Sequence, residues 1–273
     1  MKIEEYKRFG QVHAYEMGWA PVGRPVMTVH VFIAGHVMID TGSRHTRESA
    51  CRIADQHGVE SVLLTHYHED HAGNAAAVKK RLGIPVFAHP RTCQKMENPA
   101  RIYPYQHLMW GPAQGLRPSV LPELVMNGRF RFQPIHAPGH SRDHTVFLEP
   151  GQGWLFSGDL YLGDRIKYFR ADENIAEQIS SLRKILKYDF EALFCAHRPA
   201  IKDGKKRLAR KLDYLENFYG RVGELSAMGL DAKAIMKRLR LREAWLIRVM
   251  CFGNVSMENM VRSVMETRGQ IRV

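Results

Sequence analysis

The sequence predicts a layered α/β sandwich followed by a helical C-terminal extension. Through residue 88 the pattern runs strands, helix, strand, helix, strand, an order typical of a sheet covered by helices. Apolar strand-like runs end repeatedly at a small residue or turn followed by a histidine or aspartate. From residue 205 onward the spacing of apolar residues is helical. We therefore expect a catalytic domain at residues 1–203 and a helical extension at 204–273 that packs on it.

Residues 1–40 have the composition of β-strands. The run at 27–33 is rich in β-branched and aromatic residues. The strand that follows it ends at Asp40, whose carboxylate has two open roles. It either caps the next segment or accepts a hydrogen bond from a metal-binding side chain. Helical spacing at 47–57 then separates this strand from the next one.

The next strand, at 60–64, leads into the densest cluster of potential metal ligands in the chain. His66, His68, Asp70 and His71 fall within six residues. In an extended segment alternate side chains point the same way, so His66, His68 and Asp70 are expected on one face. Imidazoles together with a carboxylate suit divalent zinc, manganese or iron.

His71 breaks this alternation and can join the other ligands only if the chain turns after Asp70. We expect that turn to be the start of a helix over 71–82, with Asp70 as its N-cap and Gly83 as its stop. Strand, turn and helix start would then present three imidazoles and a carboxylate at one point.

Residues 96–124 are predicted to be irregular, because five prolines and two glycines interrupt them. Tyr105 and Trp110 belong to an aromatic cluster inside this insertion. An aromatic, irregular insertion often forms one wall of a substrate pocket. The alternative is a flap that packs on the core, and both interpretations stand at this stage.

Three further apolar strands end at potential ligands. The first leads to His136 and His140, the second to Asp159 and the third to His197. Because the ends of neighbouring strands meet at one edge of a sheet, these side chains are expected to converge. His136 and His140 compete for one ligand position, and the turn at 138–139 directly before His140 favours the latter.

The chain carries a formal charge of +12, and its C-terminal part is especially basic. Residues 200–273 hold 16 lysines and arginines against 8 acidic residues, a balance of +8. Such a balance favours anionic partners, and nucleic acid is one interpretation. The other interpretation is a set of solvated helix faces, because no nucleic-acid motif with interleaved aromatic residues accompanies the charge.

Composition also bears on the compartment. The four cysteines are widely spaced and are predicted to be reduced, buried side chains. The N-terminus lacks the apolar core of a signal peptide, and no stretch approaches the ~18 apolar residues of a membrane span. A cytoplasmic protein without a membrane partner is therefore expected, and the sequence leaves its oligomeric state undefined.

Taken together, these elements resemble the metallo-β-lactamase fold hydrolases in residue identity, order and approximate spacing. The resemblance spans about residues 10–200. It implies a four-layer αββα sandwich, and the helical C-terminal extension lies outside the shared core. The elements that carry it are Ile39-Asp40-Thr41-Gly42, His66-x-His68-x-Asp70-His71, Gly139-His140, Gly158-Asp159 and His197.

The resemblance also implies two divalent metal ions, with zinc expected and iron or manganese as alternatives. The residues matching the first metal position are His66, His68 and His140. Those matching the second are Asp70, His71 and His197, with Asp159 bridging both.

The function implied is that of a hydrolase in which a metal-bridging hydroxide attacks a small ester, thioester or lactone. Asp70 is the candidate catalytic residue, as both ligand and proton shuttle. The candidates for supporting or pocket-lining roles are Asp40, His144, Tyr161, Tyr105 and Trp110. Tyr161 follows Asp159 closely, and either donates to a developing oxyanion or serves in packing.

Two alternative functions remain open. Some members that resemble this chain have helical C-terminal extensions and cut single-stranded RNA, so a phosphodiesterase or endoribonuclease is the first alternative. Its binding would weaken steeply with salt, whereas turnover of a small ester would not. The second alternative is a mononuclear iron sulfur dioxygenase, which uses fewer ligands than this chain offers.

Overall fold

The computed structural model describes residues 1–271, and its first sheet has seven strands that lie in sequence order. Its first four strands pair antiparallel, and the strands from β4 to β7 pair parallel. Helices and loops long enough to cross over connect the parallel strands. The strands are β1 (Lys2–Phe9), β2 (Val12–Trp19), β3 (Val29–Ala34), β4 (Val37–Ile39), β5 (Ser61–Leu63), β6 (Val86–Ala88) and β7 (Ser119–Val120).

The second sheet has five strands in the order β13-β11-β10-β9-β8. Its strands pair antiparallel except for β11 and β13, which run parallel. They are β8 (Val125–Asn127), β9 (Phe130–His136), β10 (Thr145–Glu149), β11 (Trp154–Gly158) and β13 (Ala192–Cys195). A separate two-stranded sheet joins β12 (Phe169–Arg170) to β14 (Val255–Ser256), and so ties the catalytic region to the C-terminal helices.

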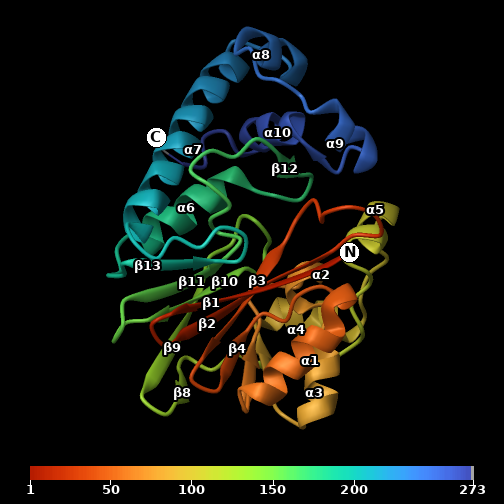
Figure 1. The fold of residues 1–273 in the computed structure, drawn as a ribbon. Coiled ribbons are helices and arrows are strands. Elements are labelled where there is room, and N and C mark those ends of the chain that lie inside the picture. The colour runs from red at the N-terminus through yellow and green to blue at the C-terminus, as the bar shows by residue number, and fades with distance from the viewer. Residues whose placement is uncertain (272–273) are drawn as a thin grey trace.

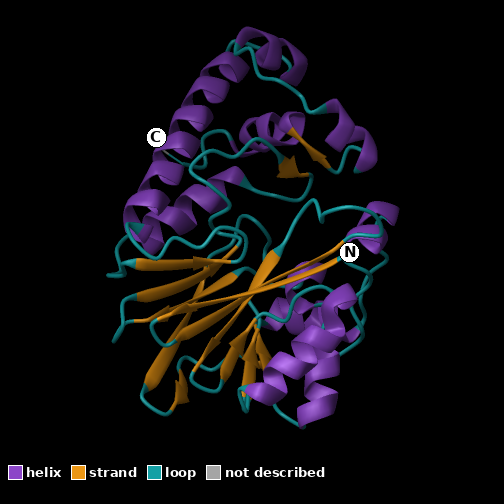
Figure 2. Cartoon of the chain, in the orientation of Figure 1, coloured by secondary structure: helices purple, strands orange, loops and turns teal. Residues whose placement is uncertain are grey.

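Helices cover the outer face of each sheet (Figure 1 and Figure 2). The first group, on the side of the seven-stranded sheet, is η1 (Arg44–Thr46), α1 (Arg47–Gln56), α2 (Glu69–Ala72), α3 (Ala75–Leu82), α4 (Pro90–Glu97) and α5 (Pro104–Met109). On the side of the five-stranded sheet, α6 (Ile175–Ile185) and α7 (Gly204–Ala227) lie nearest the sheet, and α8 (Ala232–Arg238), α9 (Trp245–Met250) and α10 (Met257–Thr267) lie farther out (Figure 1).

Three apolar clusters define the layers. One cluster lies between the sheets and includes Phe32 from β3 together with Phe147 and Phe156 from the second sheet. Another packs the first sheet against α1, α3 and α4. The third packs the second sheet against α6, α7, α8 and α10. The predicted αββα sandwich with a helical C-terminal region is therefore confirmed.

The C-terminal helices share this third core with α6. Leu208 and Leu215 of α7 and Val261 of α10 are fully buried in it. Burial of this kind removes apolar surface from water and contributes roughly 1.5–3 kcal/mol for each large side chain. The helical region is thus packed on the sheet. The division of the chain at residues 203 and 204 remains a prediction, although α7 begins at Gly204.

The helix expected over 71–82 is two helices. The first, α2, begins at Glu69 with His68 as its N-cap, so the expected N-cap role of Asp70 is wrong. The second, α3, begins after Asn74, whose side-chain amide donates to the carbonyl oxygens of Thr41 and Ser43. These hydrogen bonds hold the chain against the loop after β4 and interrupt the helix there.

The expectations about the cysteines and about membrane spans can be compared with the structure. Cys51, Cys93, Cys195 and Cys251 are all free, as predicted, but only Cys93 and Cys195 are buried. The expectation of burial is wrong for Cys51 and Cys251, which are partly exposed on helix α1 and directly after α9. Among residues 1–271, every helix is too short or too polar to serve as a membrane span.

Candidate metal centre

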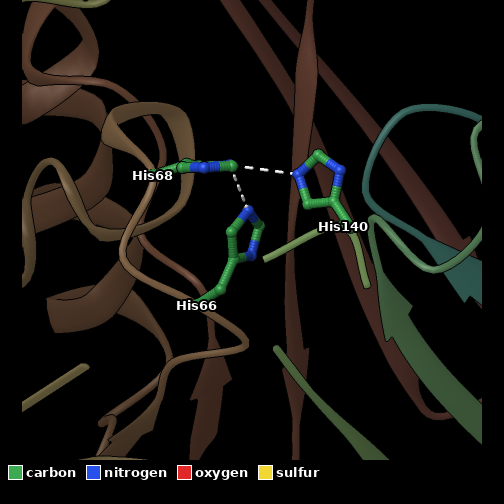
Figure 3. A group of neighbouring side chains, drawn as sticks. All are labelled: His66, His68 and His140. Atoms are coloured by element: carbon green, nitrogen blue, oxygen red, sulfur yellow. Dashed lines mark hydrogen bonds between the residues drawn. The ribbon is translucent and has the colours of Figure 1, made fainter. Parts of the chain in front are cut away.

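Three histidines from two separate loops converge on one point. His66 and His68 follow β5, and His140 follows β9. The Nδ1 atom of His68 lies 2.8 Å from Nε2 of His66 and 3.0 Å from Nε2 of His140. Figure 3 shows the three rings directed toward one another. These nitrogen atoms form a group that can hold one cation.

A second group lies beside the first. Asp70 and His71 come from α2, and His197 follows β13. Oδ2 of Asp70 lies 3.8 Å from Nε2 of His71 and 3.7 Å from Nε2 of His197. This carboxylate and the two imidazoles form another group with the composition of a metal site.

The Asp159 carboxylate lies between the two groups. Its Oδ2 atom is 3.4 Å from Nε2 of His140 in the first group. Its Oδ1 atom is 3.4 Å from Nε2 of both His71 and His197 in the second. One side chain thus offers a separate oxygen to each group, which is the geometry required of a bridging ligand.

Four of the five histidines direct Nε2 inward because the protein holds their Nδ1 atoms. Partners of this kind fix the tautomer and the ring orientation of metal-binding histidines. The Nδ1 partners are Thr65 Oγ1 for His66 at 3.0 Å, Asp40 Oδ2 for His71 at 2.8 Å, Glu173 Oε2 for His140 at 3.3 Å and the Thr28 carbonyl oxygen for His197 at 2.6 Å.

Two glycines allow the ligands to reach their positions. Gly139, directly before His140, has a φ of 128°, and a Cβ there would lie 2.3 Å from the Gln178 backbone nitrogen. Gly158, directly before Asp159, has a φ of 46°, and a Cβ would lie 2.8 Å from Nε2 of His144. Any other side chain at these positions would displace the ligand that follows.

The residues fit a pair of cations. Burial lowers the pKa of His66 and His68 well below the usual range, so both are neutral and able to ligate. Burial opposes ionisation of Asp159, yet His71 and His197 hold the pKa of its carboxyl well below the usual range. Among residues 1–271, the buried atoms His71 Nε2 and Asp159 Oδ1 lack hydrogen-bond partners. Buried polar atoms left without partners are costly, and bound metal ions would satisfy them.

The comparison with known protein families agrees with this geometry. The family model for the metallo-beta-lactamase superfamily matches residues 25–197, a segment that holds both groups of ligands. The chain belongs to this superfamily. The match confirms the predicted family and its fold.

Related proteins of this superfamily have several different names. A "Beta-lactamase-like protein 2 homolog" from Drosophila melanogaster is 25% identical over 68% of this chain and 64% of its own length. A "Hydroxyacylglutathione hydrolase" from Bdellovibrio bacteriovorus is 31% identical over 53% of this chain and 51% of its own length. An "Atrochrysone carboxyl ACP thioesterase" from Aspergillus fumigatus is 25% identical over 66% of this chain and 52% of its own length. The chain therefore spans about half to two thirds of these relatives.

Solved structures share the metallo-beta-lactamase fold across much of the chain. A family protein from Thermus thermophilus has a TM-score of 0.63 at 20% identity, covering 95% of this chain and 93% of that one. The protein TTHA1623, in a di-iron-bound form, has a TM-score of 0.56 at 26% identity and covers 69% of this chain and 96% of that one.

Within this metallo-beta-lactamase fold, Asp40 orients ligands. Its Oδ2 atom contacts Nδ1 of His71 at 2.8 Å, and it accepts two hydrogen bonds from Thr65, each of 2.8 Å. Between the two roles left open by the sequence, the contacts favour the second, acceptance from a metal-binding side chain. Its φ of 58° makes the sharp turn after β4 that brings the carboxylate under the site.

We expect Asp40→Asn to weaken metal binding by roughly 10–100-fold, because the ring of His71 loses its charged partner. Competition with a chromophoric chelator would measure the change. Asp55→Asn, which alters a surface ion pair with Arg81, is the matched control. Equal metal affinity in Asp40→Asn and the native protein would contradict the orienting role.

The other candidate side chains have different surroundings. His144 accepts a hydrogen bond from the Asp159 backbone nitrogen at 3.0 Å, so it holds the backbone of Asp159 in place. His136 is exposed and lies outside both groups, bonding instead to the Arg142 carbonyl oxygen at 3.0 Å. The Tyr161 hydroxyl donates to Asp164 and the ring belongs to the third core, which favours the packing interpretation.

The irregular insertion at residues 96–124 forms part of a cavity wall, as one of the two interpretations expected. The expected residues, Tyr105 and Trp110, do not line that cavity. Tyr105 is buried and accepts a hydrogen bond from the Asn254 side chain at 2.8 Å, with Trp110 packed edge-on against it. The cavity wall is built by residues 98–102, Gln106, Pro112 and Ala113. Tyr105 thus ties the insertion to the turn between α9 and β14, and Trp110 packs against Tyr105.

Two supporting residues have no counterpart in the sequence prediction. Glu173 reaches His140 from 33 positions away, and no local pattern marks that pairing. Lys211 of α7 is 1% exposed and donates to the Leu160 carbonyl oxygen at 2.6 Å, directly after Asp159. The sequence indicates a buried role for this lysine only through its position between Leu208 and Leu215 on the apolar face of a helix.

Lys211 gives a prediction for the pH dependence of stability. Burial lowers the pKa of Lys211 from 10.5 to about 8. Between these values the unfolded chain binds more protons than the folded one, so the native protein should gain stability as pH rises from about 8 to about 10.5. Lys211→Met should lack this gain, and denaturant unfolding of both proteins across that range would measure it. Parallel curves would contradict the assignment, and Lys187→Met, at an exposed position, is the control.

Proposed function

We propose that this protein is a hydrolase that uses two metal ions to cleave a small ester, thioester or lactone. The observation that carries the proposal is the Asp159 carboxylate, which offers Oδ2 to the first group of ligands and Oδ1 to the second. Neither group would need such a shared residue if only one cation were bound. If the protein bound one cation, as in the dioxygenase alternative, the second group of Asp70, His71 and His197 would have no metal ion to bind.

The ligand assignment follows from the two groups. His66, His68 and His140 would hold the first ion, and Asp70, His71 and His197 would hold the second. When bound, two divalent ions supply a hydroxide at neutral pH and polarise the oxygen of the scissile group. Asp40, Glu173 and Thr28 keep the imidazoles in the tautomer that directs Nε2 inward.

Asp70 is proposed to accept the proton released as water attacks. Its Oδ2 atom faces His71 and His197, at the edge of the second group. A carboxylate in this position can act as a general base if the attacking water binds beside these residues, because a general base must lie close to the proton that it accepts.

The names of two relatives support an ester or thioester substrate. One relative is a hydroxyacylglutathione hydrolase, and another is an atrochrysone carboxyl ACP thioesterase. Zinc is the proposed metal because imidazole and carboxylate ligands suit it well. The di-iron form of TTHA1623 supports iron as the alternative.

Elemental analysis of protein purified without added metal, followed by a substrate panel, tests the proposal. We expect close to two zinc, iron or manganese ions per chain and hydrolysis of at least one ester, thioester or lactone. Single-stranded RNA belongs in the panel, and RNA cleavage that weakens steeply with salt would replace the proposal by the phosphodiesterase alternative. One iron per chain with oxygen consumption would replace it by the dioxygenase alternative.

A further inference from the structure

A cavity of about 200 Å³ opens beside the candidate metal centre. Tyr67 and Glu69 line it, and these residues flank His68 in the sequence. The opposite wall is the insertion between α4 and α5, and Arg170 of β12 closes a third side. None of the seven candidate ligands lines the cavity itself, so Tyr67, Glu69 and Arg170 are the residues that connect it to the candidate metal centre.

Arg170 is anchored to the metal centre through Glu173. Its backbone nitrogen donates to Oε1 of Glu173 at 2.9 Å, and Oε2 of the same carboxylate contacts Nδ1 of His140 at 3.3 Å. The Arg170 Nε atom donates to Asp172 at 3.1 Å. Within residues 1–271, no hydrogen bond from the terminal guanidinium nitrogens of Arg170 is formed, so these donors remain free for a ligand.

Lys95 supplies a second cation to the cavity. Its Nζ atom lies 3.3 Å from the centre of the Tyr67 ring, which holds the ammonium group over the ring face by a cation–π contact. Across the part of the chain that the structure describes, Lys95 forms no ion pair with a carboxylate. The ring therefore positions the ammonium group without neutralising it.

The charge of the cavity wall is positive. Lys95, Arg101 and Arg170 line it, against the single carboxylate of Glu69. Glu69 accepts a hydrogen bond from the Gln106 side chain at 3.2 Å, so its carboxylate already has a partner. Asp172, which pairs with Arg170, is half exposed at 48% and does not line the cavity.

We propose that this cavity, through Arg170 and Lys95, binds an anionic substituent of the substrate, a carboxylate or a phosphate. The forked guanidinium group matches the paired oxygens of either anion, and the ammonium group adds a second charge. The anion so held places the rest of the substrate at His68 and the metal centre. This inference rests on the proposed hydrolase function and adds the substrate class to it.

Matched thioester pairs that differ in one anionic group test the inference. One pair carries the charge on the acyl side, as succinyl and succinamoyl thioesters of one thiol. Another carries it on the thiol side, as acetyl thioesters of 3-mercaptopropionate and its amide. A third compares acetyl pantetheine with and without a terminal phosphate, which separates phosphate from carboxylate recognition. We expect the native protein to prefer the charged member of at least one pair by about tenfold or more in kcat/KM.

Arg170→Met should abolish that preference and Arg170→Lys should restore part of it, because the charge returns without the fork. Lys95→Met should reduce it through an independent residue. Lys187→Met removes the same charge from an exposed position just after the end of α6 and should leave the preference unchanged. An equal preference in Arg170→Met and the native protein, or none in the native protein, would overturn the inference.

A binding measurement separates this inference from the proposed function. Calorimetry with a non-hydrolysable thioether carboxylate and its amide reports recognition without turnover. If no ester, thioester or lactone is cleaved, yet the carboxylate binds the native protein about tenfold more tightly than Arg170→Met, the hydrolase proposal fails and the anion site stands. If the carboxylate binds both proteins equally, for example at the metal ions alone, the anion site is wrong.

Discussion

Replacing Asp159 with alanine is expected to remove both metal ions together and to lower kcat/KM roughly a thousandfold. Metal polarisation of a scissile group contributes several kcal/mol to the transition state, and each ~1.4 kcal/mol corresponds to a factor of ten. The two losses should coincide because Oδ1 and Oδ2 of this residue face different groups of ligands. The repulsion between two neighbouring cations would also rise without the anion between them.

Elemental analysis and hydrolysis assays on the same preparation measure the effect. Asp213→Ala, an exposed change on α7 of the same kind, is the control and should keep both metal and activity. Circular dichroism confirms that the variant is folded. A variant that keeps one ion firmly bound would show that the two groups are independent, and Asp159 would then not be a bridging ligand.

The second large effect is expected at Asp70, whose two proposed roles can be separated. Asp70→Asn retains an oxygen that can ligate but loses the basic carboxylate, so we expect kcat to fall by about 10²–10⁴ with much of the metal retained. Asp70→Ala also removes the oxygen near His71 and His197, and should lose the second ion in addition.

Metal content and kcat, measured for both variants across a range of pH, distinguish these roles. Equal loss of activity and metal in both variants would reduce Asp70 to a ligand. An Asp70→Ala protein with full metal and full activity would remove it from the mechanism. Asp213→Asn, at the same exposed position on α7 as above, serves as the control for a lost carboxylate.

Local sequence predicted most of the elements that carry the ligands. Asp40, His66, Asp159 and His197 lie where a run of apolar strand residues ends and a small or polar residue follows. Such patterns are local, because a short apolar run and the glycine or proline that ends it are recognised without any distant partner. The division of the helix at 71–82 was missed because Asn74 is held by Thr41 and Ser43, which are about thirty positions away.

The chemical nature of the site follows from the amino-acid sequence alone: imidazoles and carboxylates stand at the ends of apolar strands, in the order of a known superfamily. Which of these atoms meet depends on the tertiary structure. It excluded His136, gave Asp40 its role beside His71, and brought Glu173, Lys211 and Arg170 to the site. The type of each candidate ligand is given by the residue itself, whereas the partners of these ligands lie on different layers of the sandwich. Whether these residues come into contact depends on how the two sheets and the helices that cover them pack together. No local sequence pattern predicts that packing.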